Sequence, residues 1–146
     1  MRVVRFYLGD WGVYAACKQR GDCQVAEFLE FGADESDEDA EPKKLDRIAK
    51  DKVRMLALLQ RVAEVGPPRN AEISHQIQGA IWQFRSGRVR VLWFYGQGRE
   101  VLLSNAFEKD SRKTPRAELQ RALETSREFH AAVESVSLER VEEVEE

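Results

Sequence analysis

The strongest structural signal in this sequence is a pair of β-strand patterns separated by only two residues. Positions 80–85 read Ala-Ile-Trp-Gln-Phe-Arg, and positions 88–95 read Arg-Val-Arg-Val-Leu-Trp-Phe-Tyr. Between them, Ser86 and Gly87 favour a tight turn, because glycine adopts a positive φ at no steric cost. The two runs predict an antiparallel hairpin with one buried face and one face that can carry charged side chains.

Further elements can be predicted from the same kind of pattern. In chain order these are a strand over 2–8, a short helix over 23–30, a long helix over 43–65, alternating residues over 73–77, a strand over 100–104 and a last helix from 114. Residues 11–21 fit no single pattern. Hairpin-linked strands flanked by helices define the α+β class. We therefore expect an antiparallel sheet with the N-terminal helices and the C-terminal helix packed on one face, and the hairpin 80–95 at its centre.

A few residues predict where the helices begin and end. Asp22 is suited to cap the first helix, and Gly32 is suited to end it. Residues 66–68, Gly-Pro-Pro, end the long helix. At the last helix, Thr114 is predicted as the N-cap and Pro115 as the first helical residue.

Charge is segregated along the chain. Residues 1–42 hold 4 Lys/Arg against 10 Asp/Glu, residues 43–130 hold 18 against 10, and residues 131–146 hold 1 against 6. A basic centre is what phosphate binding requires, because neutralised phosphates dominate nucleic-acid affinity. One acidic loop and one acidic tail would produce the same segregation without any nucleic-acid partner.

The length of 146 residues fits one domain with one core. We expect a single domain over 1–134, with an exposed acidic loop at 33–42 inside it and an acidic tail over 135–146. No apolar run approaches the roughly 20 residues that cross a bilayer, and the strand-like N-terminus is unlike a signal peptide. A cytoplasmic location without a membrane partner is therefore expected.

Cysteine and histidine are too sparse to suggest a metal site. The cysteines are Cys17 and Cys23, and the histidines are His75 and His130, far apart in the sequence. Two thiols in a chain without an export signal are expected to be reduced. Neither a metal nor another cofactor is predicted.

The region from about residue 79 to 128 carries a more specific combination of residues. They are Trp82, Phe84, Arg85, Arg90, Val91, Leu92, Phe94, Tyr95, Val101, Leu102, Leu103, Asn105, Ala106, Phe107, Lys109, Lys113, Thr114 and Pro115. With these residues the chain resembles the RelE/HigB superfamily of small toxins, in its phage-derived HigB-like branch. The Lys-Thr-Pro run before the last helix is the most specific part of the resemblance.

The resemblance implies a ribosome-dependent endoribonuclease that cleaves messenger RNA, inhibits translation and is paired with a cognate antitoxin. Its chemistry is metal-independent: the 2′-hydroxyl of the RNA attacks the adjacent phosphate, while the protein positions the strand, stabilises charge and moves two protons. Carried over by position, the resemblance implies catalytic roles for Arg85, Arg90, Tyr95, Lys109 and Lys113.

Three departures from the HigB-like pattern keep a second interpretation open. Asn105 stands where that branch often has histidine, and an amide cannot transfer protons; Glu108 and Asp110 add negative charge near the expected site. The alternative is a catalytically degenerate, phage-encoded protein of the same fold that binds and inhibits or redirects host machinery such as RNA polymerase or the ribosome. In that case the arginines are a solvated strand face, and His75 is an ordinary strand-face imidazole.

Overall fold

The chain forms an α+β fold, as predicted, around a seven-stranded sheet. The computed structural model describes residues 1–17, 22–32, 47–109 and 114–142. The elements are β1 (Arg2–Leu8), β2 (Gly12–Cys17), α1 (Gln24–Leu29), α2 (Arg47–Val65), β3 (Ser74–Gln78), β4 (Ile81–Ser86), β5 (Val89–Tyr95), β6 (Glu100–Glu108), α3 (Arg116–Glu134) and β7 (Glu139–Val141).

The sheet is mixed rather than purely antiparallel. Its strand order is β3-β4-β5-β6-β2-β1-β7. The pairs that follow one another in the chain are antiparallel, whereas β2 pairs with β6 and β1 pairs with β7 in parallel. The predicted hairpin is present as β4 and β5, but β6 occupies the centre of the sheet. The two parallel pairs join strands that are far apart in sequence, so no local sequence pattern could predict these pairings.

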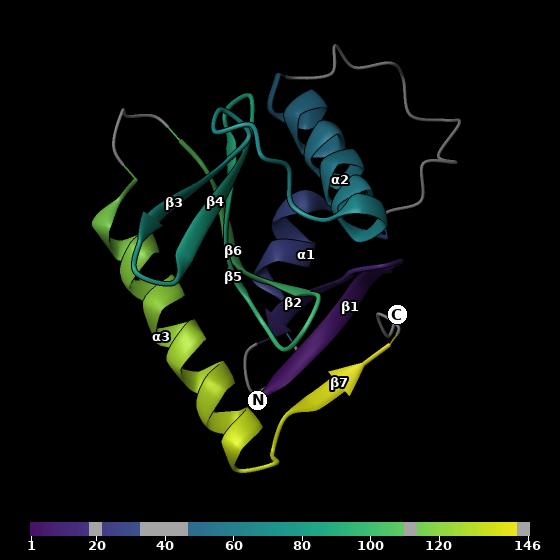
Figure 1. Ribbon diagram of the computed structural model, residues 1–146. Coiled ribbons are helices and arrows are strands. Elements are labelled where there is room, and N and C mark those ends of the chain that lie inside the picture. The colour runs from purple at the N-terminus through teal and green to yellow at the C-terminus, as the bar shows by residue number, and fades with distance from the viewer. Residues whose placement is uncertain (18–21, 33–46, 110–113, 143–146) are drawn as a thin grey trace.

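Helices cover both faces of the sheet, and the expectation of a single covered face was wrong in this respect. Figure 1 shows α3 on one side of the sheet and α1 with α2 on the other. We call these sides the α3 face and the α2 face. β5 supplies both: Val89, Val91 and Trp93 pack toward α2, while Leu92 and Phe94 pack toward α3. Because β5 is apolar on both faces, its sequence reads as a nearly continuous hydrophobic run.

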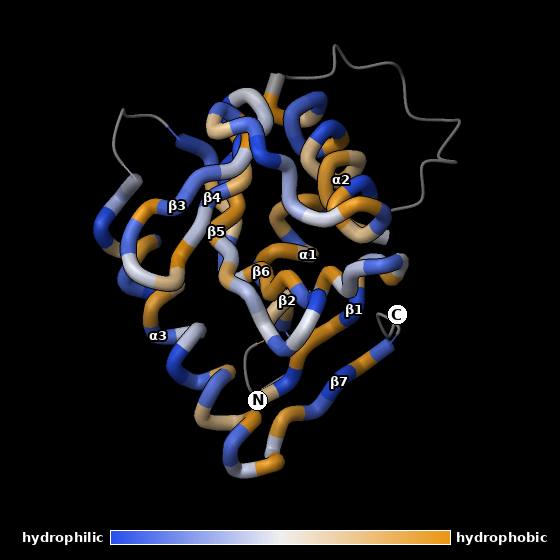
Figure 2. The backbone as a smooth tube through the Cα atoms, viewed as in Figure 1, coloured by the Kyte–Doolittle hydropathy of each residue, from blue (hydrophilic) through white to orange (hydrophobic). Residues whose placement is uncertain are grey.

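Each face therefore has its own core. The α2-face core is built around Met55, Leu59 and Trp93, and the α3-face core around Phe94 and Phe129; all five side chains are fully buried. The alternation of hydrophobic and hydrophilic residues along α2 and α3 is visible in Figure 2. It is the 3.6-residue periodicity of helices that bury one stripe.

The turn of the β4–β5 hairpin is held from α2. Gly87 has a φ of +57°, a conformation that favours glycine. A carboxylate oxygen of Asp51 accepts a hydrogen bond from the backbone N–H of Arg88 at 2.9 Å. A side chain at Gly87 would collide with that same carboxylate. The turn thus requires glycine for two separate reasons.

Several predicted element ends shift by a residue or more. Cys23, not Asp22, is the N-cap of α1, and the left-handed residue that ends it is Glu30 with a φ of 56°. Pro115, not Thr114, is the N-cap of α3. The Thr114 hydroxyl instead donates to the side-chain oxygen of Gln83 at 3.1 Å, which fixes the start of α3 to β4.

Two other regions differ from the sequence-based expectation. The ambiguous residues 11–21 contain β2, and part of the expected acidic tail forms β7 beside β1. Arg140 of β7 makes an ion pair with Glu100 and lies over the ring of Tyr14 at 5.2 Å. The acidic loop 33–42, the first residues of the long helix predicted over 43–65, and the end of the tail at 143–146 lie outside the described residues.

Candidate functional site

Arg85 and Arg90 lie side by side on the α3 face. They are register partners in the antiparallel pairing of β4 with β5. Directly opposed residues of an antiparallel pair project to the same face. The next pair along, Gln83 with Leu92, points to the same face, and Leu92 belongs to the α3-face core. The hairpin therefore brings together the two arginines that the sequence singled out.

The two arginines differ in exposure. Arg85 is exposed, whereas Arg90 is only 6% exposed. Arg90 donates from one terminal nitrogen to the carbonyl oxygens of Gly87 at 2.6 Å and Val89 at 3.1 Å, and its Nε is buried without a partner in the described part of the chain. Arg90 thus supports the hairpin turn and adds a buried positive charge beneath the surface that Arg85 presents.

Lys109 completes a cluster of cations at this site. Its backbone N–H donates to the carbonyl oxygen of Arg88 at 2.8 Å, so the chain continues beside β5 beyond the end of β6. Burial lowers the pKa of Lys109, and the positive charges of Arg90 and Arg85 lower it further. The pKa of Arg90 is also lowered, first by burial and then by Arg85, with Asp51 opposing the shift. Cations that depress one another's pKa create a positive potential that favours an anion.

Tyr95 does not join this cluster. It lies on the α2 face, where its ring packs against Trp93, Trp82 and Trp11 at centroid distances of 4.9, 5.9 and 6.1 Å. Burial raises the pKa of Tyr95. The resemblance implied a catalytic role for Tyr95 together with the arginines, but the alternation of β5 turns Tyr95 and Arg90 to opposite faces.

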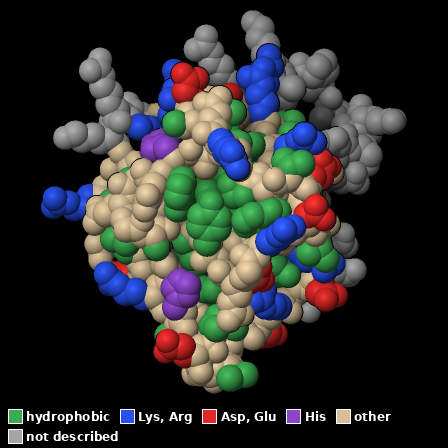
Figure 3. All heavy atoms as spheres, in the orientation of Figure 1, with side chains coloured by type: hydrophobic (Ala, Val, Ile, Leu, Met, Phe, Trp, Pro, Cys, Tyr) green, Lys and Arg blue, Asp and Glu red, His purple; other side chains and the backbone are tan. Residues whose placement is uncertain are grey.

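The side chains around Trp93 form a partly exposed aromatic group. Trp11 and Trp82 are half-buried, and Tyr95 is 40% exposed. Figure 3 shows hydrophobic side chains gathered near the centre of the side in view, with basic side chains at their border. We call Trp11, Trp82 and Tyr95 the aromatic group.

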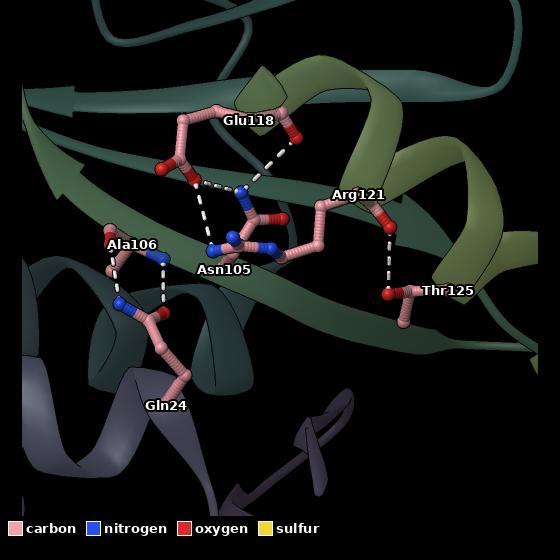
Figure 4. A network of polar contacts seen from close by, with 6 residues as sticks. All are labelled: Gln24, Asn105, Ala106, Glu118, Arg121 and Thr125. Carbon is pink, nitrogen blue, oxygen red and sulfur yellow. Dashed lines mark hydrogen bonds and ion pairs between the residues drawn. The ribbon is translucent and has the colours of Figure 1, made fainter. Parts of the chain in front are cut away.

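Asn105 anchors α3 to the central strand. It is fully buried, and its amide nitrogen donates to the side-chain oxygen of Glu118 at 2.6 Å and to the Glu118 carbonyl at 3.2 Å. Figure 4 shows this contact, with Arg121 beside the same carboxylate at 3.7 Å. Asn105, one of the departures noted in the sequence, therefore has a structural role here.

A second amide secures β6 from the other face. The side chain of Gln24 accepts from the N–H of Ala106 and donates to its carbonyl, both at 2.7 Å (Figure 4). The pairing of β2 with β6 ends at Leu103. Gln24 thus serves the backbone groups of Ala106 beyond the end of β2, and it ties α1 to the sheet.

The remaining sequence-predicted positions fall in three places. Glu108 pairs with Val89 on the α2 face and contacts Arg88 at 3.9 Å, so it points away from the cationic cluster. Lys113 and Asp110 lie outside the described residues. His75 of β3 is the register partner of Gln83 and so lies on the α3 face.

Sequence reasoning missed Asp51, which holds the hairpin turn, and Gln83, which accepts a hydrogen bond from Thr114 at the start of α3. It placed Thr114 at the start of this helix, but as the helix cap. Gln83 and Arg85 are two residues apart in β4, and this spacing alone indicated that their side chains share a face. The contacts of Asp51 and Thr114 could not be foreseen, because each joins elements that are distant in sequence.

One cavity in the described structure lies apart from the cationic cluster. It has a volume of about 940 Å³ and lies beside the N-terminus and the C-terminal half of α3, where Arg2, Cys17 and Glu128 contribute to its wall. Cys17 and Cys23 are both free and buried. Among the residues that the structure describes, no three His, Cys, Asp or Glu side chains are grouped as a metal ion requires. None of the described helices is long and apolar enough to cross a membrane.

These features define a class: a small α+β protein whose mixed sheet carries a cluster of cations on one face, beside the start of the last helix. The family model described as "Phage derived protein Gp49-like (DUF891)" matches residues 43–127, more than half of the chain. The chain belongs to this phage-derived Gp49-like family, which is part of the RelE/HigB-like toxin superfamily. No curated protein matches the chain. The matched segment contains the hairpin, β6 and Lys109.

Proposed function

We propose that this protein is a RelE/HigB-like toxin that cleaves messenger RNA on the ribosome in the cytoplasm, thereby inhibits translation, and is controlled by a cognate antitoxin. The observation that carries the proposal is the cluster of Arg85, Arg90 and Lys109 on one face of a rigid sheet. Family membership supports it, because the Gp49-like family lies within a toxin superfamily.

The cluster suits phosphoryl chemistry on RNA. When the 2′-hydroxyl attacks the adjacent phosphate, negative charge accumulates on the non-bridging oxygens. Preorganised cations stabilise that charge more in the transition state than in the ground state. Arg85 and Lys109 are accessible for direct contact, and the buried charge of Arg90 raises the potential from below.

The test compares two exposed arginines in a ribosome-dependent cleavage assay. Arg85→Ala removes a cation from the cluster, whereas Arg99→Ala removes one from the turn before β6, at the opposite end of β5. Arg85→Ala is expected to slow cleavage by about 10²–10³-fold, or about 2.7–4 kcal/mol, as for the loss of one preorganised donor. Arg99→Ala is expected to cleave at the wild-type rate. A wild-type chain that neither cleaves messenger RNA nor slows translation would rule out the nuclease function.

A second candidate function has its own observation. The aromatic group is partly exposed on the face opposite the cations, and half-exposed Trp and Tyr side chains are typical of protein interfaces. A catalytically degenerate protein that binds host RNA polymerase or the ribosome would use such a surface. In that case, Trp82→Ala is expected to abolish growth inhibition while Arg85→Ala leaves it intact. The nuclease function predicts that Arg85→Ala abolishes growth inhibition.

A further inference from the structure

The proposed cleavage requires two proton transfers. The structure excludes two of the candidate side chains, Asn105 and Tyr95, from these roles. One group must take the proton of the 2′-hydroxyl, and another must give a proton to the leaving 5′-oxygen. Asn105 cannot do either, since its amide is not titratable and is bonded to Glu118. Tyr95 lies on the other face. The following inference rests on the proposed nuclease function and assigns these two roles.

His75 lies on the same face as the arginine pair. In β3 it is opposite Gln83 of β4, whereas Arg85 is two residues further along β4 on the same face. Diagonal neighbours of this kind are about 7–8 Å apart at Cα, within reach of long side chains. The backbone N–H of Arg85 also donates to the carbonyl of Ile73 at 2.8 Å, which fixes the register beside His75.

Four side chains follow one diagonal across the α3 face. Lys109 stands beyond the end of β6, Arg90 on β5, Arg85 on β4 and His75 on β3. The two arginines occupy the middle, and the two groups that can exchange protons occupy the ends. From the usual strand spacing and rise, the Cα atoms at the two ends are about 20 Å apart.

An in-line displacement fits this order of residues. The attacking 2′-oxygen and the leaving 5′-oxygen lie on opposite sides of the phosphorus, with the charged non-bridging oxygens between them. A base and an acid on opposite sides of an arginine pair match that arrangement. A base and an acid adjacent to one another would not.

The ring of His75 also has an unmet hydrogen-bonding group. Its Nδ1 is buried and has no hydrogen-bond partner among the residues that the structure describes. A buried polar atom without a partner is unfavourable and rare in folded proteins, and a functional role is one of its recognised explanations. His130, the other histidine, is exposed on α3.

We propose that His75 is the general base and Lys109 the general acid of the cleavage. The proton of the 2′-hydroxyl passes to His75 as the bond from O2′ to phosphorus forms. The bond from phosphorus to O5′ breaks, and Lys109 gives a proton to O5′, which leaves a 2′,3′-cyclic phosphate and a 5′-hydroxyl. The imidazole takes the first role because it can accept a proton, whereas an ammonium group can only donate.

The test uses the full chain, ribosomes and two messenger RNAs that differ at the scissile bond. One RNA is natural, and the other has sulfur in place of O5′, a leaving group that needs no protonation. On natural RNA, His75→Ala, His75→Gln and Lys109→Ala are each expected to slow cleavage by about 10²–10⁴-fold. On the sulfur-containing RNA, Lys109→Ala is expected to recover to within about tenfold of wild type, while both His75 variants remain slow.

Controls separate this inference from the proposed function and from misfolding. His130→Ala removes the other imidazole and is expected to cleave both RNAs like wild type. His75→Gln keeps a polar side chain of similar reach, and its thermal unfolding is compared with wild type to exclude a folding defect. Wild-type cleavage by both His75 variants, or their rescue by the sulfur leaving group, overturns the assignment of His75 as base while the nuclease function stands. Absence of cleavage by the wild-type chain overturns both.

Discussion

At the scale of single residues, Arg85 and Arg90 show how one pair of similar side chains is divided between two tasks. Arg85 is exposed and available to a ligand, whereas Arg90 is buried and bonded to the carbonyls of the turn. The lowered pKa of Lys109 reflects its burial and the charges of both arginines. Without an anion, the repulsion within this cluster lowers the free energy of unfolding at neutral pH. This loss of stability becomes smaller as pH rises and Lys109 loses its proton.

An anion should therefore stabilise the folded protein. Pyrophosphate is expected to raise Tm above its value in chloride of matched ionic strength, because a ligand that binds only the folded state stabilises it. At about 100 times Kd the gain is about 2.7 kcal/mol, or several degrees for a chain of this size. Differential scanning fluorimetry measures the shift. Arg85→Ala should remove most of it and Arg99→Ala should not; an equal shift in both variants would place the anion elsewhere.

Asn105 gives a second prediction at this scale. Asn105→Ala removes both hydrogen bonds to Glu118 from a fully buried position. The free energy of unfolding is expected to fall by about 1–3 kcal/mol, because the partly buried side chain of Glu118 loses its donor. Urea unfolding checks this value. Gln120→Ala, at an exposed position of α3, is the control and should change stability little.

At the scale of elements, the β4–β5 turn shows how a helix can select a turn residue. Both Gly79, before β4, and Gly87, before β5, have positive φ values, of 55° and 57°. A side chain at Gly79 would meet nothing within 4 Å among the described residues, whereas one at Gly87 would meet the carboxylate of Asp51. Both turns therefore have a left-handed backbone conformation that is strained for any residue with a side chain. Only the β4–β5 turn, at Gly87, also contacts α2.

Alanine substitutions at the two glycines separate these effects. Gly79→Ala is expected to cost about 1–2 kcal/mol, the penalty of a left-handed conformation for a residue with a side chain. Gly87→Ala carries the same strain and also displaces Asp51 from the N–H of Arg88, so its loss of stability should be clearly larger. Chemical denaturation of both variants measures the difference. Equal losses would mean that the contact with Asp51 contributes nothing.

At the scale of the whole molecule, one sheet serves two cores. Strands β5 and β6 contribute buried side chains to both faces. A change in either core must therefore be transmitted to the other through the shared strands. This arrangement predicts a single cooperative unfolding transition, as small domains usually show.

Core truncations on opposite faces test this cooperativity. Leu59→Ala, in the α2-face core, and Phe129→Ala, in the α3-face core, are expected to destabilise by about 2–5 and 3–5 kcal/mol. Tryptophan fluorescence is sensitive to the α2-face core, which contains Trp93, and circular dichroism follows the helices. For each variant the two probes should give the same midpoint. If Phe129→Ala lowered the midpoint by circular dichroism alone, α3 would unfold as a separate unit.

The sequence alone determined the β4–β5 hairpin and the alternation that places Arg85 beside Arg90. It also determined the helices near 24–29 and 116–134. The reason is that periodicity, turn residues and helix breakers act between neighbours along the chain. The same local signals located the basic centre and the α+β class. They misplaced some element ends by a residue, because tertiary contacts such as the bond from Thr114 to Gln83 compete with local capping.

Only the tertiary structure decided which strands pair across long intervals, and hence which side chains share a face with the arginines. The parallel pairing of β2 with β6, the helices on both faces and the burial of Arg90 all depend on contacts between distant segments. Within one strand, alternation determines which side chains share a face of the sheet. Between two strands, the side chains that share a face are known only once the paired residues are known. For that reason Tyr95, close to Arg90 in sequence, lies on the opposite face, while His75 lies on the face of Arg85.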